Sequence, residues 1–166
     1  MTLIDISTER PANPVDNIEL IAAHNDWTFE RSGEEEITVS VTGHWCDYHV
    51  SFTWMEELES LHLACAFDIK VLEARRTEVV RLLSLVNEQL WIGHFDLWQD
   101  EGVVMYRHGL LLAGCLEATD EQIGRMLETA LETCERFYQA FQFVVWAGKT
   151  ARESLDMAMI ETVGEA

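Results

Sequence analysis

The sequence predicts a single α+β domain, in which helices cover an antiparallel sheet. Several stretches alternate apolar and polar residues, which is typical of strands with one buried face. Other stretches carry apolar residues at helical spacing. The strands come in runs separated by helices, and this arrangement favours an α+β fold over a parallel sheet. With 166 residues, 48% of them apolar, the chain suits one domain with its own core.

The first part of the chain is predicted to form one helix and three strands. Asn13-Pro14 marks the start of the helix, because asparagine caps free backbone amides and proline fits the first turn. This helix is expected to continue to about Asn25. Three strands of an antiparallel meander then follow, near residues 37–41, 48–54 and 61–67.

A second helix is predicted from about Glu73 to Trp91, because its apolar residues recur at helical spacing and Gly93 ends the pattern. Two further strands are expected near residues 95–98 and 103–112, joined by a short acidic turn that contains a glycine. These strands should complete the sheet.

The last part of the chain is predicted to be helical. Thr119 is expected to cap a long helix, with Glu121 and Gln122 near the capping-box position, and a shorter helix is expected over residues 151–162. The predicted order is therefore α-β-β-β-α-β-β-α plus a C-terminal helix. Residues 1–13 are expected to form a flexible tail, of which residues 1–12 are not needed for folding, and residues 14–166 to form the domain.

The charge of the chain excludes some classes of partner. Thirty acidic side chains stand against 11 basic ones, which gives a net charge of −19. Nucleic-acid binding needs lysine and arginine to neutralise phosphates, and an anionic membrane surface would repel this chain. No stretch of about 18 apolar residues and no signal peptide are found, so we expect a cytoplasmic protein.

The histidines and cysteines were considered as metal ligands. His44, Cys46 and His49 are close in the sequence, and His62 and Cys65 follow one strand later. On an extended strand Cys46 and His49 would point to opposite faces, and zinc needs four ligands at definite spacings. We therefore expect no metal site.

The same residue types were considered as catalytic groups. Cys115 or Cys65 could pair with His94 or His108 as nucleophile and base, but nothing in the local sequence marks an activated thiolate. The four cysteines, which include Cys46 and Cys134, form no CxxC pair and are expected to be free thiols.

A phosphate-binding loop was also considered. Gly148-Lys149-Thr150 resembles the end of such a loop, but Phe143 occupies the position where the motif needs a glycine. A helix end at Gly148 and a cap at Thr150 explain the segment better. We expect neither a catalytic residue nor a cofactor.

Tryptophan is abundant in this chain. Some of the six must belong to the core, because a buried indole contributes a large area, but one or two could lie on a binding face, where tryptophan is enriched. The sequence does not say which. The six are Trp27, Trp45, Trp54, Trp91, Trp98 and Trp146.

Several segments together resemble the bacterial YbjN family, a group described as sensory-transduction regulators. They are Trp27–Arg31, Cys65–Lys70, Arg75–Val79, Val86–Trp98, Tyr106–His108 and Glu135–Phe143. The resemblance covers roughly residues 14–162. It implies a fold similar to the small homodimeric chaperones of type III secretion, to which the last helix is an addition. It brings no catalytic residues.

These observations predict a non-enzymatic module, chaperone-like or regulatory, that binds another protein and stabilises or modulates it. The acidity, the surplus of aromatic residues and the resemblance all favour this function. Two alternatives stay open. The chain could be a sensory domain that binds a small ligand in an apolar pocket, or an enzyme of unrecognised type.

A homodimer is also predicted. The apolar arc of the helix from Glu73 to Trp91 spans roughly 240°, which is more than one packing surface requires. Leu85 lies on one flank of this arc, and Val80 and Trp91 lie on the other. These three residues are the expected dimer contact, because a symmetric dimer is the commonest way to bury such a surface. Alternatively, the terminal helices of the same chain cover the flank.

Overall fold

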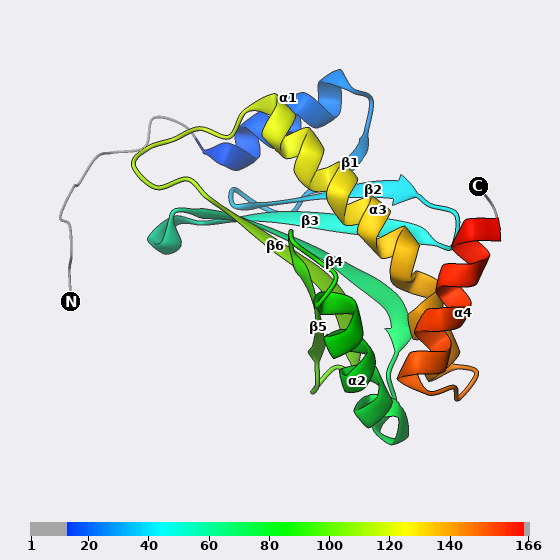
Figure 1. The fold of residues 1–166 in the computed structure, drawn as a ribbon. Helices are drawn as coiled ribbons and strands as arrows, with labels where there is room; N and C mark the ends of the chain where they lie inside the picture. The colour runs from blue at the N-terminus through cyan, green and yellow to red at the C-terminus, as the bar shows by residue number, and fades with distance from the viewer. Residues whose placement is uncertain (1–12, 165–166) are drawn as a thin grey trace.

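The computed structural model describes residues 13–164, so all of the predicted tail except Asn13 lies outside the described residues. The described chain forms a six-stranded antiparallel sheet and four α-helices (Figure 1), which confirms the predicted fold class. The strand order is β1-β2-β3-β4-β6-β5. The elements are α1 (Pro14–His24), β1 (Thr28–Arg31), β2 (Glu36–Thr42), β3 (Asp47–Met55), β4 (Ser60–Lys70), α2 (Arg76–Asn87), β5 (His94–Trp98), β6 (Val103–Leu111), α3 (Asp120–Val145) and α4 (Ala151–Gly164).

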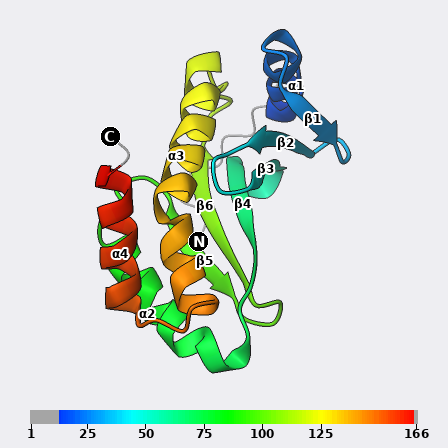
Figure 2. The same ribbon diagram turned by 90° about the vertical axis from the view of Figure 1, so that its right-hand side faces the viewer.

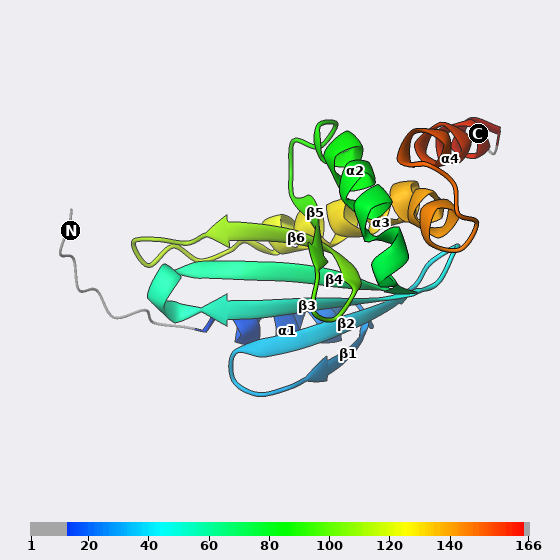
Figure 3. The same cartoon turned by 90° about the horizontal axis from the view of Figure 1, so that it is seen from below.

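One face of the sheet carries the core. Side chains alternate along each strand, and the inward set, which includes Val39, Val50 and Leu63, packs with apolar residues of all four helices. Helix α1 contacts β2 and β3, α3 contacts β4 and β6, and α2 contacts β5, while α4 packs on α2 and α3 (Figure 2). Seen from below, strands β1 to β4 lie in front of α1 (Figure 3). The helices therefore leave the other face of these strands uncovered.

The predicted element order was wrong in one place, because it lacked β1. This strand has four residues and pairs with β2, so that Phe29 lies opposite Val39 and Arg31 opposite Ile37. Four residues with only one large apolar side chain are too short for a period-2 pattern to stand out. The strand forms because β2 offers its edge.

The second predicted helix was wrong at its end, because α2 stops at Asn87 and leaves Trp91 in the following loop. The side chain of Asn87 instead pairs with the backbone of Phe95, whose N–H donates to Oδ1 (2.8 Å) and whose carbonyl accepts from Nδ2 (2.9 Å). The side-chain amide of Asn87 thus satisfies backbone groups on the edge of β5 that has no neighbouring strand in the described part of the chain. Gly93 then turns the chain back with a φ of +68°, which favours glycine.

The capping signals in the sequence are confirmed. Asn13 Oδ1 accepts a hydrogen bond from the N–H of Val15 at 2.9 Å, and Pro14 occupies the first turn of α1. Thr119 and Gln122 form the complete capping box at the start of α3. Both caps satisfy backbone donors that a helix start otherwise leaves free.

An aromatic cluster joins the sheet to α3. Phe67 on β4 contacts the rings of Tyr48, Phe95, Tyr138 and Phe141, with centroid separations of 5.1 to 6.5 Å. Such tilted and edge-on pairs stabilise a core beyond the area that they bury. This cluster fixes α3 across the middle of the sheet.

No helix within residues 13–164 is long and apolar enough to cross a membrane.

Candidate functional site

The three residues predicted as a dimer contact have different environments. Val80 is half-exposed on α2, and Trp91 is fully exposed in the loop after it. Leu85 is partly buried, beside a hollow that the first residues of α4 help to line. In addition, the N–H of Ala151 at the start of α4 donates to Glu78 Oε2 of α2 at 2.9 Å. Helix α4 of the same chain thus covers the Leu85 flank in part.

The tryptophans divide into two sets. Trp54 is buried, and Trp27 and Trp45 are partly buried and pack against the core. The exposed set is Trp91, Trp98 and Trp146, with exposed fractions of 100%, 44% and 62%. Trp91 and Trp98 lie at opposite ends of β5, so the exposed indoles do not gather into one patch.

The candidate metal ligands and thiols lie in different surroundings. The backbone N–H of His44 donates to Glu135 Oε1 at 2.7 Å, and His49 Nδ1 hydrogen-bonds the hydroxyl of Ser40 at 2.9 Å. Burial raises the pKa of the Cys46 thiol, and raises that of Cys134 well above its ordinary value. Within residues 13–164 no three or more such side chains are placed to hold a metal ion.

Two further histidines, His62 as a candidate metal ligand and His108 as a candidate base, are affected by their surroundings. Burial and then the nearby charge of Arg107 lower the pKa of His62, and burial lowers that of His108. Cys65, one of the two thiols considered as a nucleophile beside His108, is fully buried on the core face of β4. A thiol with no exposed surface is out of reach of a substrate.

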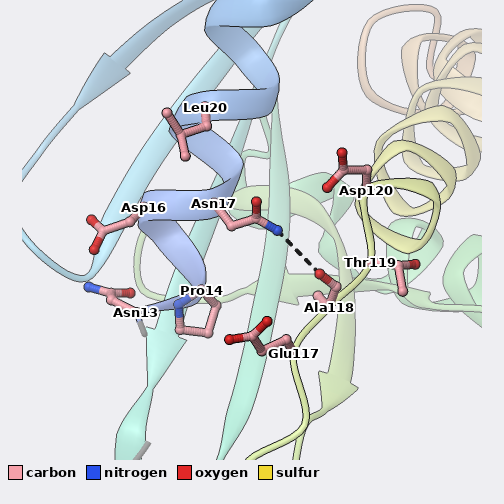
Figure 4. Close-up of a pocket in the computed structure, with 9 residues that line it drawn as sticks. All are labelled: Asn13, Pro14, Asp16, Asn17, Leu20, Glu117, Ala118, Thr119 and Asp120. Carbon is pink, nitrogen blue, oxygen red and sulfur yellow. Dashed lines mark hydrogen bonds between the residues drawn. The ribbon is translucent and has the colours of Figure 1, made fainter. Parts of the chain in front are cut away.

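A hollow of about 520 Å³, which we call the helix-start hollow, lies between the first residues of α1 and the segment that leads into α3 (Figure 4). The two walls are joined where Asn17 Nδ2 donates to the carbonyl of Ala118 at 3.2 Å. Both caps described above stand at its rim. The lining residues are Asn13, Pro14, Asp16, Asn17, Leu20, Glu117, Ala118, Thr119 and Asp120.

The helix-start hollow combines apolar surface with negative charge. Leu20 is 68% exposed, and it shares the hollow with the apolar Pro14 and Ala118. Glu117 and Asp120 add carboxylates, and Asp16 forms an ion pair with Arg31 at 2.8 Å. The hydroxyl of Thr119 is already used by the capping box. The lining of the helix-start hollow therefore suits the binding of an apolar group beside a cation better than it suits bond-breaking chemistry.

Sequence reasoning did not find this hollow. Its walls come from segments about a hundred positions apart, which only the fold brings together. The capping signals at Asn13 and Thr119 marked the two helix starts, but nothing in the sequence indicates that they are neighbours.

The chain is similar to known proteins in sequence and in structure. A family model, described as "Putative bacterial sensory transduction regulator", matches residues 14–143. A crystal structure of YbjN, "a putative transcription regulator from E. coli", covers 78% of this chain and 90% of its own, with 11% identity and a TM-score of 0.55. The crystal structure of the ExsC–ExsE complex covers 74% and 91%, with 17% identity and a TM-score of 0.47. No curated protein matches the sequence.

Proposed function

The chain belongs to the YbjN family, and from this premise we propose that it binds another protein and regulates or stabilises it, without catalysing a reaction. The family is described as one of regulators, and a regulator must recognise something else in the cell. The helix-start hollow is the observation that carries the proposal, because it offers an apolar surface with carboxylates around it.

Charge supports a basic partner. The chain carries a net charge of −19, so a partner segment with lysine or arginine is attracted over long range and its encounter is accelerated. An apolar side chain of the same segment would be buried against Leu20 and Pro14. The two alternatives from the sequence, a small ligand in an apolar pocket and an enzyme of unrecognised type, stay open. The cytoplasmic location also stays a prediction.

Substitution of Leu20 tests the proposed function. Leu20→Lys places a cation in the helix-start hollow. We expect this variant to lose a partner protein that the wild-type chain retains from a bacterial lysate. Leu20 is exposed, so the variant should fold normally. Ile160→Lys is the matched control, because Ile160 is similarly exposed on α4, and it should retain the partner.

The same experiment has contrary outcomes. Retention of the same protein by both variants would show that the helix-start hollow is not the contact. If the wild-type chain retains no protein, while a small metabolite raises its melting temperature, then the ligand-binding alternative is favoured, because a bound ligand stabilises the folded state by mass action.

A homodimer remains part of the proposal, with Val80 of α2 and Trp91 of the loop after α2 at the contact. These residues keep exposed fractions of 50% and 100%, whereas α4 partly covers Leu85. We expect light scattering to report about twice the 19.1 kDa chain mass at micromolar concentration. Val80→Asp should yield folded monomer, and Leu58→Asp, which changes a leucine that is 60% exposed elsewhere, should stay dimeric. A wild-type chain that is monomeric at high concentration excludes this contact.

A further inference from the structure

A second hollow, which we call the sheet hollow, is lined mainly by residues of β3 and β4 that alternate with the core-facing ones. It has a volume of about 690 Å³. Strands β3, β4 and β6 form its floor, where Ser51 lies opposite Ala64 and Ala66 opposite Met105. The loop before β3 forms one wall with Trp45, Cys46 and Asp47, and His49, Phe67 and Asp68 complete the lining.

The shape of the sheet hollow follows from side-chain size. Ser51, Ala64 and Ala66 are small, whereas Trp45 and Met105 beside them are large. The indole N–H of Trp45 donates to the carbonyl of Glu135 on α3 at 3.2 Å, which fixes this wall. One wall of the hollow is therefore tied to α3.

The floor of the sheet hollow is apolar and its rim is acidic. Met105 and Phe67 are buried beneath it. Asp47 and Asp68 lie at the rim, and the phenol of Tyr138 donates to Asp68 Oδ1 at 2.6 Å, which holds this carboxylate in place. The lining contains no lysine or arginine, and His49 is paired with Ser40. The hollow is therefore complementary to a cation on an apolar stem.

We propose that the sheet hollow binds an arginine side chain of a partner protein. The methylene stem of arginine would lie on the small and apolar floor, because such stems are buried while their charged ends reach polar groups. The planar guanidinium matches carboxylates through paired hydrogen bonds and stacks on indole rings, which the compact ammonium of lysine does less well. Asp47, Asp68 and Trp45 supply these groups.

This inference goes beyond the proposed function, because the sheet hollow is separate from the helix-start hollow. It relies on the proposed function only for the source of the arginine. The substitution Leu20→Lys does not touch the sheet hollow, so failure of one site is distinguishable from failure of the other.

The test is a titration with the peptide N-acetyl-Leu-Arg-Leu-amide, followed by NMR of the tryptophan indole N–H signals. Trp45→Phe assigns the signal of Trp45. We expect that signal to shift with the arginine peptide, and to stay unchanged with a peptide in which neutral citrulline replaces arginine. The measurement is made in about 0.15 M salt, to screen the attraction of the net charge.

Two variants separate specific binding from the general acidity of the chain. Ala66→Phe changes no charge and fills the hollow from an exposed strand position, so it should weaken the arginine peptide about tenfold while the fold is kept. Asp47→Asn should weaken it about fivefold, whereas Asp100→Asn, the same change at an exposed turn, should have no effect.

Three results would overturn the inference. The first is a Trp45 signal that does not move with the arginine peptide. The second is an Ala66→Phe variant that binds the arginine peptide as tightly as the wild-type chain does. The third is an equal loss in Asp47→Asn and Asp100→Asn, which would attribute binding to net charge alone.

Discussion

Replacement of Phe67 by alanine is expected to lower the free energy of unfolding by about 3–5 kcal/mol, the range for removal of a buried aromatic ring. Phe67 is 4% exposed and contacts four other rings, which belong to β3, β5 and α3. Its loss leaves a cavity that this rigid cluster cannot close. Denaturant unfolding at 25 °C, followed by circular dichroism, measures the change.

Phe29→Ala is the matched control for this prediction. Phe29 lies on the four-residue edge strand β1 and is only partly buried, so the same change should cost about half as much or less. If Phe67→Ala does not fold, Phe67→Leu, which should cost about 1.5 kcal/mol, is compared with Phe29→Leu, which should cost clearly less because Phe29 is only partly buried. Equal costs at both positions would contradict the central role of Phe67.

The parts of the fold that local signals determine were predicted correctly. The caps at Asn13 and Thr119 depend on residues at most three positions away, so the sequence shows them directly. The strands near residues 48–54 and 61–67 have long alternating patterns, because each lies between two neighbours and has one face in the core. A strand with one buried face shows this alternation whatever the rest of the fold is, so the sequence alone reveals it.

The errors arose where distant contacts decide the local structure. Helix α2 ends at Asn87, because the amide of this residue satisfies the backbone of Phe95. The apolar residues after Asn87 continue the helical spacing, and nothing in that pattern reveals the competing hydrogen bonds. Strand β1 was missed for the same kind of reason, since β2 provides its partners.

The candidate sites could not be predicted from the sequence. The sheet hollow depends on Ala64, Ala66 and Met105 meeting across β4 and β6, and the helix-start hollow depends on Asn17 reaching Ala118. The aromatic count drew attention to tryptophan, and it indicated neither that Trp45 lines a hollow nor that Trp91 lies outside the helix. Composition shows the sign of this chain's own charge, and only the fold shows where the two hollows lie.

The tyrosines predict that the folded state loses stability at alkaline pH. Tyr48, Tyr106 and Tyr138 are the three tyrosines of the chain, and all are buried. Burial raises the pKa of Tyr106 to about 12. Burial also raises the pKa of Tyr48, and burial together with the hydrogen bond to Asp68 raises that of Tyr138.

The direction of the pH dependence follows from these shifts. Below the unfolded pKa of about 10 all three phenols are protonated in both states, so the full stability is present. Above it the unfolded chain releases protons that the folded chain retains, so stability falls by up to about 4 kcal/mol per pH unit for three such groups. We therefore expect cooperative unfolding above about pH 10, in which tyrosinate absorbance appears together with the loss of circular dichroism.

A tyrosine that ionises near its ordinary pKa while circular dichroism stays native would contradict this account, because it would show a phenol open to water. Tyr138→Phe supplies the control. It removes one of the three phenols, so the fall of stability with pH should become about one third less steep. At neutral pH it should cost about 1 kcal/mol, because the hydrogen bond to Asp68 Oδ1 is lost but water can reach this exposed carboxylate. The loss of stability at neutral pH measures the hydrogen bond of Tyr138. The change in the dependence of stability on pH above about pH 10 measures the ionisation of its phenol. If only the first changes in Tyr138→Phe, then Tyr138 does not contribute to the alkaline unfolding.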